Sequence, residues 1–304
     1  DFGLCRRQKA HQHHRDDSQG GHEILGGKHD GYSRRSHAGC MRVMKPVYGS
    51  AVMFTAKNLM SALAVISMML VGLLAAAQAE VVRIAVASNF KPAMDELELV
   101  FEEQSGHDLL VSAGSTGKLY AQIVNGAPYD VFLSADQERP RLLIEEGRAQ
   151  DQFTYAVGRI VLLDPIAKSA GPDRLTQMNF RRLAIANPEL APYGQAARQV
   201  ITTLGLFDAL QDRIVLGENI GQTYAFIRTG NAELGFVALS QLDPKVREQT
   251  GLVWIPPQES YNPIRQDAVL LRRGEQNAAA QDFIHFLKSE KAKALIRGHG
   301  YETE

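Results

Sequence analysis

Cysteine is nearly absent from the sequence. The chain has 304 residues and two cysteines, Cys5 and Cys40, both close to its start. The part from residue 80 onward has none, which excludes a disulfide framework, a thiol nucleophile and a cysteine-based zinc site there. Positive charge is also scarce, because residues 80–304 carry 23 Lys and Arg against 29 Asp and Glu, a net charge of −6. This balance argues against a basic nucleic-acid-binding surface, and we predict no nucleic-acid partner.

Long apolar runs are scarce too, with one exception. Residues 59–77 are uncharged, follow Lys57 and end at Ala77-Gln78-Ala79. A basic start, an apolar stretch and a small-residue A-x-A site are typical of a secretory signal peptide. The run approaches the roughly 20 residues of a membrane anchor, but two serines and a glycine dilute it. We therefore predict a signal peptide at 53–79, cleavage after Ala79 and a periplasmic location, without a lipid anchor because no cysteine follows.

Residues 1–52 have a different composition from the rest. They begin without Met, are rich in His, Arg and Gly, and show no apolar period. The cluster His11, His13 and His14 offers metal ligands. Translated sequence upstream of a true start, with Met53, Met41 or Met44 as the initiator, explains this composition better. We interpret 1–52 as a non-native, disordered upstream extension and leave it out of the fold.

From Glu80 the chain alternates short apolar runs with helical periods, which predicts an α/β fold. Residues 80–304 are enough for two lobes of roughly a hundred residues each. We place lobe 1 at 80–160 and 261–304 and lobe 2 at 161–260, with hinges near Arg159–Val161 and Ser260–Pro263. No low-complexity linker separates the lobes, so strands are expected to cross between them beside a ligand cleft. Strands are predicted at 81–87, 109–113, 130–134, 160–163, 183–186, 214–216, 234–238, 252–255 and 268–271, with helices after most of them.

Four predicted strand-to-helix junctions carry either small polar residues or the sequence Pro-Tyr-Gly. In open α/β sheets, ligands bind beyond the carboxyl ends of the strands, and helix N-termini there attract anions. Ser, Thr and Asn at such positions are more often simple helix caps, and at any single junction that interpretation stays open. The junctions are Ser88-Asn89, Ser115-Thr116, Pro192-Tyr193-Gly194 and Asn219-Ile220-Gly221.

Motifs for catalysis are missing from residues 80–304. The stretch Gly114–Lys118 resembles a phosphate-binding loop but fails the pattern, because Ser112 stands at the first glycine position and Leu119 at the magnesium-binding hydroxyl. There is no G-x-S-x-G motif, and none of the three histidines after residue 80 has a nucleophile motif beside it. We predict that the protein is not an enzyme and needs no cofactor.

At these junctions the sequence resembles the periplasmic molybdate-binding proteins of ABC transporters, and the resemblance covers nearly all of 80–304. It implies a type II periplasmic binding protein whose two lobes close on a tetrahedral oxyanion. It also implies a monomer that delivers molybdate, and tungstate as a nearly identical oxyanion, to a permease in the inner membrane. The segments that carry the resemblance are 86–90, 115–117, 125–136, 187–194, 217–220 and 235–238.

The resemblance also implies the site, in which molybdenum is held through its oxygens and not by Lys or Arg. Ser88 and Thr116 are expected to supply hydroxyl and backbone donors from the first lobe, with Ser115 as a further candidate. Tyr193 and Ile220 are expected to supply backbone N–H groups from the second lobe.

This chain departs from the family pattern at one position, where many members have a tyrosine whose hydroxyl contacts the ligand. This chain has Ala238 at that position. Members with that gap tend to carry Asn after the first Ser or Thr, as Asn89 does here, so we predict that the Asn89 amide N–H₂ replaces the tyrosine as a donor.

Other functions stay open at this point. A receptor for sulfate or another small tetrahedral oxyanion is the alternative within the class. A phosphate receptor is less favoured, since protonated phosphate needs a carboxylate acceptor and the expected contacts offer none, although Glu218 lies two residues before Ile220. An enzyme acting on an anionic metabolite is the alternative from another class.

Overall fold

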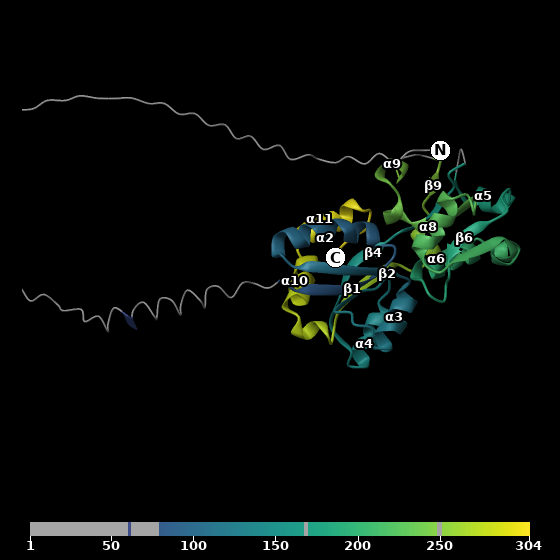
Figure 1. Ribbon diagram of the computed structural model, residues 1–304. Helices are drawn as coiled ribbons and strands as arrows, with labels where there is room; N and C mark the ends of the chain where they lie inside the picture. Colours follow the sequence, from purple (N-terminus) through teal and green to yellow (C-terminus); the bar gives the residue numbers. More distant parts are fainter. Residues whose placement is uncertain (1–59, 62–78, 167–169, 248–250) are drawn as a thin grey trace, which may run out of the picture. The chain divides into compact units, whose positions relative to one another are not determined.

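The computed structural model describes residues 60–61, 79–166, 170–247 and 251–304. The described residues from Ala79 onward belong to one compact unit, which is built on two five-stranded sheets (Figure 1). The predicted upstream extension and the predicted signal peptide lie outside the described residues, apart from Met60, Ser61 and Ala79. No helix within the described ranges is both long and apolar enough to cross a membrane.

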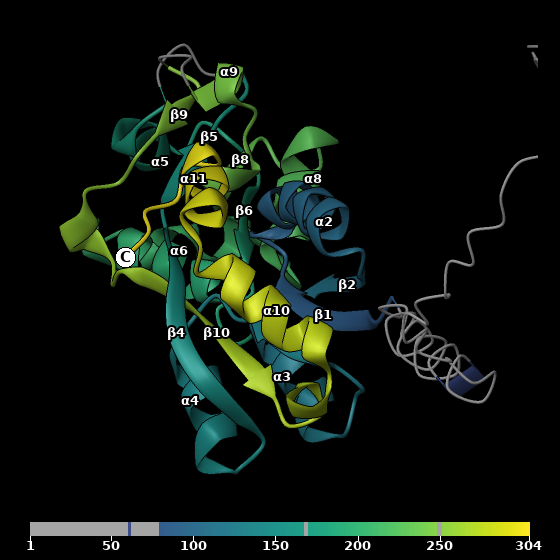
Figure 2. The same cartoon turned by 90° about the vertical axis from the view of Figure 1, so that its left-hand side faces the viewer.

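The first sheet has the strand order β2-β1-β3-β10-β4. Strand β1 is parallel to β2 and β3, whereas β10 runs antiparallel to β3 and β4. Helices α2, α10 and α11 pack on one face and α3 and α4 on the other, as Figure 2 shows. The strands are β1 (Val81–Ala87), β2 (Asp108–Gly114), β3 (Val131–Leu133), β4 (Ala149–Gly158) and β10 (Ile264–Leu271), and the helices are α2 (Lys91–Ser105), α3 (Thr116–Val124), α4 (Glu138–Glu145), α10 (Ala278–Leu287) and α11 (Glu290–Gly298).

The second sheet has the order β7-β6-β8-β5-β9. Strand β6 is parallel to β7 and β8, and β5 is antiparallel to β8 and β9. Helices α5, α6 and α7 contribute to the core on one face, and α8 and α9 to the core on the other. The strands are β5 (Ile160–Leu163), β6 (Leu183–Ala186), β7 (Ile214–Gly217), β8 (Leu234–Ala238) and β9 (Val253–Trp254), and the helices are α5 (Pro172–Gln177), α6 (Pro192–Thr203), α7 (Phe207–Leu210), α8 (Ile220–Arg228) and α9 (Pro244–Arg247). Short 3₁₀ turns are η1 (Gln211–Arg213), η2 (Leu239–Gln241), η3 (Gln258–Ser260) and η4 (Gly274–Gln276).

Strands buried on both faces explain the apolar runs in the sequence. Along β1, Val82, Ile84 and Val86 belong to the core beneath α2, while Ala85 belongs to the core on the opposite face. Successive side chains of a strand point to opposite faces, so a strand covered by helices on both sides is apolar throughout. The predicted two-lobe α/β fold is confirmed.

The chain passes between the two sheets twice. It leaves the first sheet after Gly158 and enters the second at Ile160, and it returns between Trp254 and Ile264. The predicted hinges at Arg159–Val161 and Ser260–Pro263 lie at these two crossings. Movement of the lobes about them, and the lobe boundaries drawn from the sequence, remain predictions.

Two elements differ from the sequence expectation. Strand β4 was not predicted, because its first half contains the polar run Gln150-Asp151-Gln152, of which Gln150 and Asp151 are exposed and Gln152 is half-buried. The chain also continues beyond α10 into a further helix, α11, which was not predicted; Ser289 caps it by accepting a hydrogen bond from the backbone N–H of Ala292 at 3.2 Å.

Candidate functional site: an uncharged cavity between the lobes

The four predicted junctions converge on one small cavity. Three of its segments follow strands of the first sheet, namely β1, β2 and β3, and two lie at the start of helices α6 and α8 of the second lobe. All six residues predicted for the site line it. The lining is Ala87, Ser88, Asn89, Gly114, Ser115, Thr116, Ala135, Ala191, Pro192, Tyr193 and Ile220.

The Ser115 hydroxyl is buried and has no hydrogen-bond partner among the described residues. Its side chain is 3% exposed, and it occupies the N-cap position of α3 without making a capping hydrogen bond. Buried hydroxyls are nearly always paired with protein, water or a ligand, so this one is available to bond a molecule in the cavity. The Ser115 side chain therefore does not act as a helix cap at this junction.

The Thr116 hydroxyl is oriented by the loop after β3. Its Oγ1 accepts a hydrogen bond from the backbone N–H of Ala135 at 3.1 Å. A hydroxyl has one hydrogen to donate and two lone pairs. Because the Ala135 bond uses a lone pair, the hydroxyl hydrogen of Thr116 is left for an acceptor in the cavity.

Helices α6 and α8 begin at the cavity wall. Tyr193 and Ile220 lie in their first turns, where backbone N–H groups have no intrahelical partner. In the described part of the chain, neither N–H donates a hydrogen bond to another protein group. Both N–H groups lie at helix N-termini, which carry partial positive charge. At α8 the cap interpretation also holds, because the Asn219 side chain accepts from the backbone N–H of Gln222 at 3.0 Å.

Ser88 contributes less than predicted. Its backbone N–H donates to the Gly114 carbonyl at 2.9 Å, so it is not available to a ligand. Its hydroxyl oxygen accepts from the backbone N–H of Gly221 at 3.4 Å, across the two lobes, and the hydroxyl hydrogen stays available. The expected backbone donor at Ser88 is therefore already paired in this structure, whereas the hydroxyl is available, and the role of Ser88 toward a ligand stays a prediction.

Asn89 lines the cavity, but its amide hydrogens are used elsewhere. Its Nδ2 donates to Gln266 Oε1 at 2.7 Å and to the Tyr301 hydroxyl at 3.0 Å. Neither amide hydrogen is left for a ligand in this arrangement, so direct donation by Asn89 remains a prediction. Ala238 is buried at the end of β8 and is not part of the lining.

No acid or base is among the described residues that line the cavity. The charged neighbours are paired, Lys118 with Glu218 at 2.7 Å and Arg139 with Asp136. Within the described ranges there is also no group of His, Cys, Asp or Glu that could hold a metal ion. The cavity thus offers neutral hydrogen-bond donors and no carboxylate acceptor, which suits a fully deprotonated oxyanion.

The lobes touch across the cleft, so the structure has the closed form. The backbone N–H of Gly117 donates to the Leu190 carbonyl at 2.9 Å. The bond from Gly221 to Ser88 and the Lys118–Glu218 ion pair also join the two lobes. A Cβ on Gly117 would lie 3.2 Å from the Leu190 backbone, so a glycine at this point allows the close approach.

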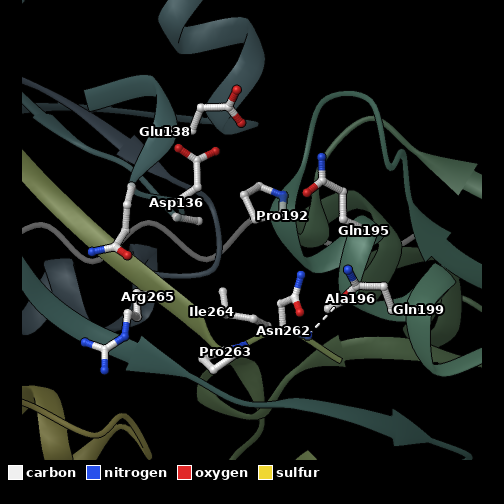
Figure 3. A pocket seen from close by; sticks show the side chains of 12 residues that line it. Asp136, Glu138, Pro192, Gln195, Ala196, Gln199, Asn262, Pro263, Ile264 and Arg265 are labelled. Carbon is white, nitrogen blue, oxygen red and sulfur yellow. Dashed lines mark hydrogen bonds between the residues drawn. The ribbon is translucent and has the colours of Figure 1, made fainter. Parts of the chain in front are cut away.

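A larger hollow lies beside the cavity, between α6 and the segment that leads into β10. Figure 3 shows Asp136 and Glu138 on one wall and Gln195 and Gln199 on another. The Gln199 Oε1 accepts from the backbone N–H of Asn262 at 2.9 Å. Two carboxylates disfavour an anion, so this hollow is not a candidate for the oxyanion site.

The chain is similar to known bacterial proteins. A family described as "Bacterial extracellular solute-binding protein" matches residues 82–302. The molybdate-binding protein ModA of Azotobacter vinelandii is 47% identical over 237 residues, which cover 76% of this chain and 93% of the relative. That of Rhodobacter capsulatus is 44% identical over 235 residues, covering 76% and 91%.

The solved structure of the Azotobacter vinelandii periplasmic molybdate-binding protein matches with a TM-score of 0.70 at 41% identity, over 73% of this chain and 99% of that one. The resemblance found in the sequence is therefore confirmed. The chain belongs to the bacterial extracellular solute-binding proteins, and it has their two-lobe, type II fold.

Proposed function

We propose that the protein captures molybdate outside the cytoplasm and delivers it to an ABC transporter permease. The unpaired, buried Ser115 hydroxyl in an uncharged cavity is the observation that carries this proposal. The likeness to proteins named as molybdate-binding supports the choice of ligand. Tungstate, which has nearly the same size and charge, is expected to bind as well.

The ligand would be held by neutral donors from both lobes. The hydroxyls of Ser88, Ser115 and Thr116 face it from the first lobe, and the backbone N–H groups of Tyr193 and Ile220 face it from the second. Hydrogen bonds to charged groups contribute about 1.5–3 kcal/mol each, so several of them offset the desolvation of a dianion. An uncharged site also avoids burying an unpaired cation when the ligand has left.

Binding of this kind is reversible and needs no catalysis or cofactor. The relatives and the family are binding proteins, and the cavity lining contains no acid–base pair. We propose that the protein works as a monomer, with lobe 1 at 80–160 and 261–304 and lobe 2 at 161–260. Donors from both lobes let the energy of ligand binding favour the closed form.

A panel of oxyanions tests the ligand class. A ligand that binds only the folded protein raises its stability by RT ln(1 + [L]/Kd). We expect molybdate and tungstate to raise the melting temperature of the purified protein, and sulfate, phosphate and chromate to do so much less at equal concentration. A larger shift with sulfate or phosphate would contradict the proposal for molybdate.

We further propose that the exported protein begins at Glu80, after removal of the predicted signal peptide. Expressed from the full sequence, the periplasmic form should have an intact mass corresponding to residues 80–304. A mass that includes residues 59–77 would show that the apolar run is retained as an anchor.

A further inference from the structure

A buried polar network joins the two lobes behind the oxyanion cavity. Gln266, on β10 of the first lobe, is completely buried. Its Nε2 donates to the Tyr193 hydroxyl of the second lobe at 3.2 Å. Its Oε1 accepts from Asn89 Nδ2 at 2.7 Å, within the first lobe. One side chain therefore contacts Asn89 in the cavity wall of one lobe and Tyr193 in that of the other.

We propose that Gln266 is a positioning residue that couples closure of the lobes to assembly of the oxyanion site. This inference rests on the proposed function for the identity of the ligand. Gln266 itself does not line the cavity. It fixes the ring of Tyr193, whose backbone N–H faces the cavity, and the amide of Asn89, which lines the opposite wall.

The chain makes room for this contact at Gly158, the last residue of β4. A Cβ there would lie 2.0 Å from the Tyr193 hydroxyl and 2.6 Å from Gln266 Nε2. Any side chain at position 158 would collide with both partners of the bond between the lobes. The Gln266–Tyr193 contact therefore requires a glycine at position 158, just before the chain first crosses between the sheets.

The energetic consequence differs between the open and closed forms. In the closed form both groups are buried, so loss of the Tyr193 hydroxyl leaves the Gln266 Nε2 donor unpaired. When the lobes separate, water can reach that donor. The cost of the lost bond therefore falls on the closed form alone, and with it on ligand affinity.

Tyr155 provides a matched control inside the same network. Its hydroxyl lies 3.3 Å from the same Gln266 Oε1 and donates to the Ser134 carbonyl at 3.0 Å. These partners all belong to the first lobe, so its bonds exist whether the lobes are open or closed. Burial raises the pKa of both the Tyr155 and the Tyr193 phenols well above the usual value, so both hydroxyls stay protonated and neutral.

The test compares Tyr193→Phe with Tyr155→Phe in the purified protein, with molybdate as the probe. We expect Tyr193→Phe to weaken binding about tenfold, mainly through faster dissociation, with little change in the melting temperature of the ligand-free protein. Tyr155→Phe should instead lower that melting temperature by about 2–4 °C and leave affinity within about twofold of wild type. Equal effects of the two changes on affinity, or wild-type affinity in Tyr193→Phe, would overturn the proposal.

A double-mutant cycle identifies Gln266 as a partner. Tyr193→Phe should weaken binding in the wild-type background and clearly less in a Gln266→Leu background, because the bond to Gln266 is already absent there and only the contact of the Tyr193 hydroxyl with Tyr301 remains to be lost. Additive effects would contradict the coupling.

A measurement without ligand separates this inference from the proposed function. A pair of spin labels, one on each lobe, reports the fraction of closed molecules in the ligand-free protein. That fraction should fall in Tyr193→Phe and not in Tyr155→Phe, even if molybdate proved not to be the ligand. An unchanged fraction in both variants would overturn the proposal, whereas failure of wild type to bind molybdate would refute only the proposed function.

Discussion

Replacing Ser115 with Ala is expected to weaken molybdate binding without destabilising the ligand-free protein. The hydroxyl has no partner among the described residues, so its removal takes away no internal hydrogen bond. If it donates to the oxyanion, affinity falls by about 1.5–3 kcal/mol, roughly tenfold to a hundredfold. Calorimetric titration gives the affinity, and thermal unfolding without ligand gives the stability.

Ser289 is the matched control for Ser115. Both serines occupy the N-cap position of a helix, but only Ser289 makes the capping bond. Ser289→Ala should therefore cost about 1 kcal/mol of stability and leave affinity unchanged. If Ser115→Ala behaved in the same way, Ser115 would be an ordinary cap and the site assignment would fail there.

Replacing Thr116 with Ala is expected to lower both affinity and stability. The hydroxyl is the acceptor for the buried N–H of Ala135, and leaving that donor unpaired costs about 1–3 kcal/mol of unfolding free energy. Loss of the hydroxyl hydrogen should also weaken molybdate binding by roughly tenfold to a hundredfold. The two effects are measured separately, by unfolding without ligand and by titration.

Thr116→Ser keeps the hydroxyl and serves as the control. It should retain most of the affinity, since only a methyl group is lost. Wild-type affinity in Thr116→Ala, together with reduced stability, would show that Thr116 supports the loop after β3 and does not bind the ligand.

The position of the site could be predicted from the sequence because it follows from strand ends. Each junction combines a short apolar run with residues that begin a helix, such as Ser115 before α3 and Pro192 at the start of α6. Parallel strands bring their carboxyl ends to one edge of a sheet, so junctions far apart in the chain meet. The structure brings together Ser88 and Thr116, which follow the neighbouring strands β1 and β2, for this reason. Ile220 follows β7 of the second sheet and reaches them because the two lobes are in contact.

The partners of the site residues could not be predicted in the same way. Asn89 bonds to Gln266 and Tyr301, which lie 177 and 212 residues further along the chain. Whether its amide faces a ligand or a neighbour depends on where β10 and the C-terminal segment pack, and no local pattern encodes that. The backbone N–H of Ser88 is a similar case, since its bond to Gly114 exists only once β1 and β2 have paired.

Strand β4 shows a second limit of local patterns. It is an edge strand that pairs with β10 and, through a single bridge at Val157, with Glu302, and its alternation is interrupted by register shifts in the pairing with β10. Asp151 within it has a positive φ of 60°. An edge strand with polar, exposed residues lacks the continuous apolar run that identified its neighbours.

Calorimetric titration of molybdate into wild type and the Ser115→Ala/Thr116→Ala double variant tests the central claim most directly. The claim is that hydroxyls in the uncharged cavity between the lobes hold the oxyanion. Wild type should give a saturable heat with one site per chain. The double variant, having lost two charge-assisted hydrogen bonds of about 1.5–3 kcal/mol each, should bind roughly a hundredfold to ten-thousandfold more weakly. The same binding isotherm in both proteins would contradict the assignment of this cavity.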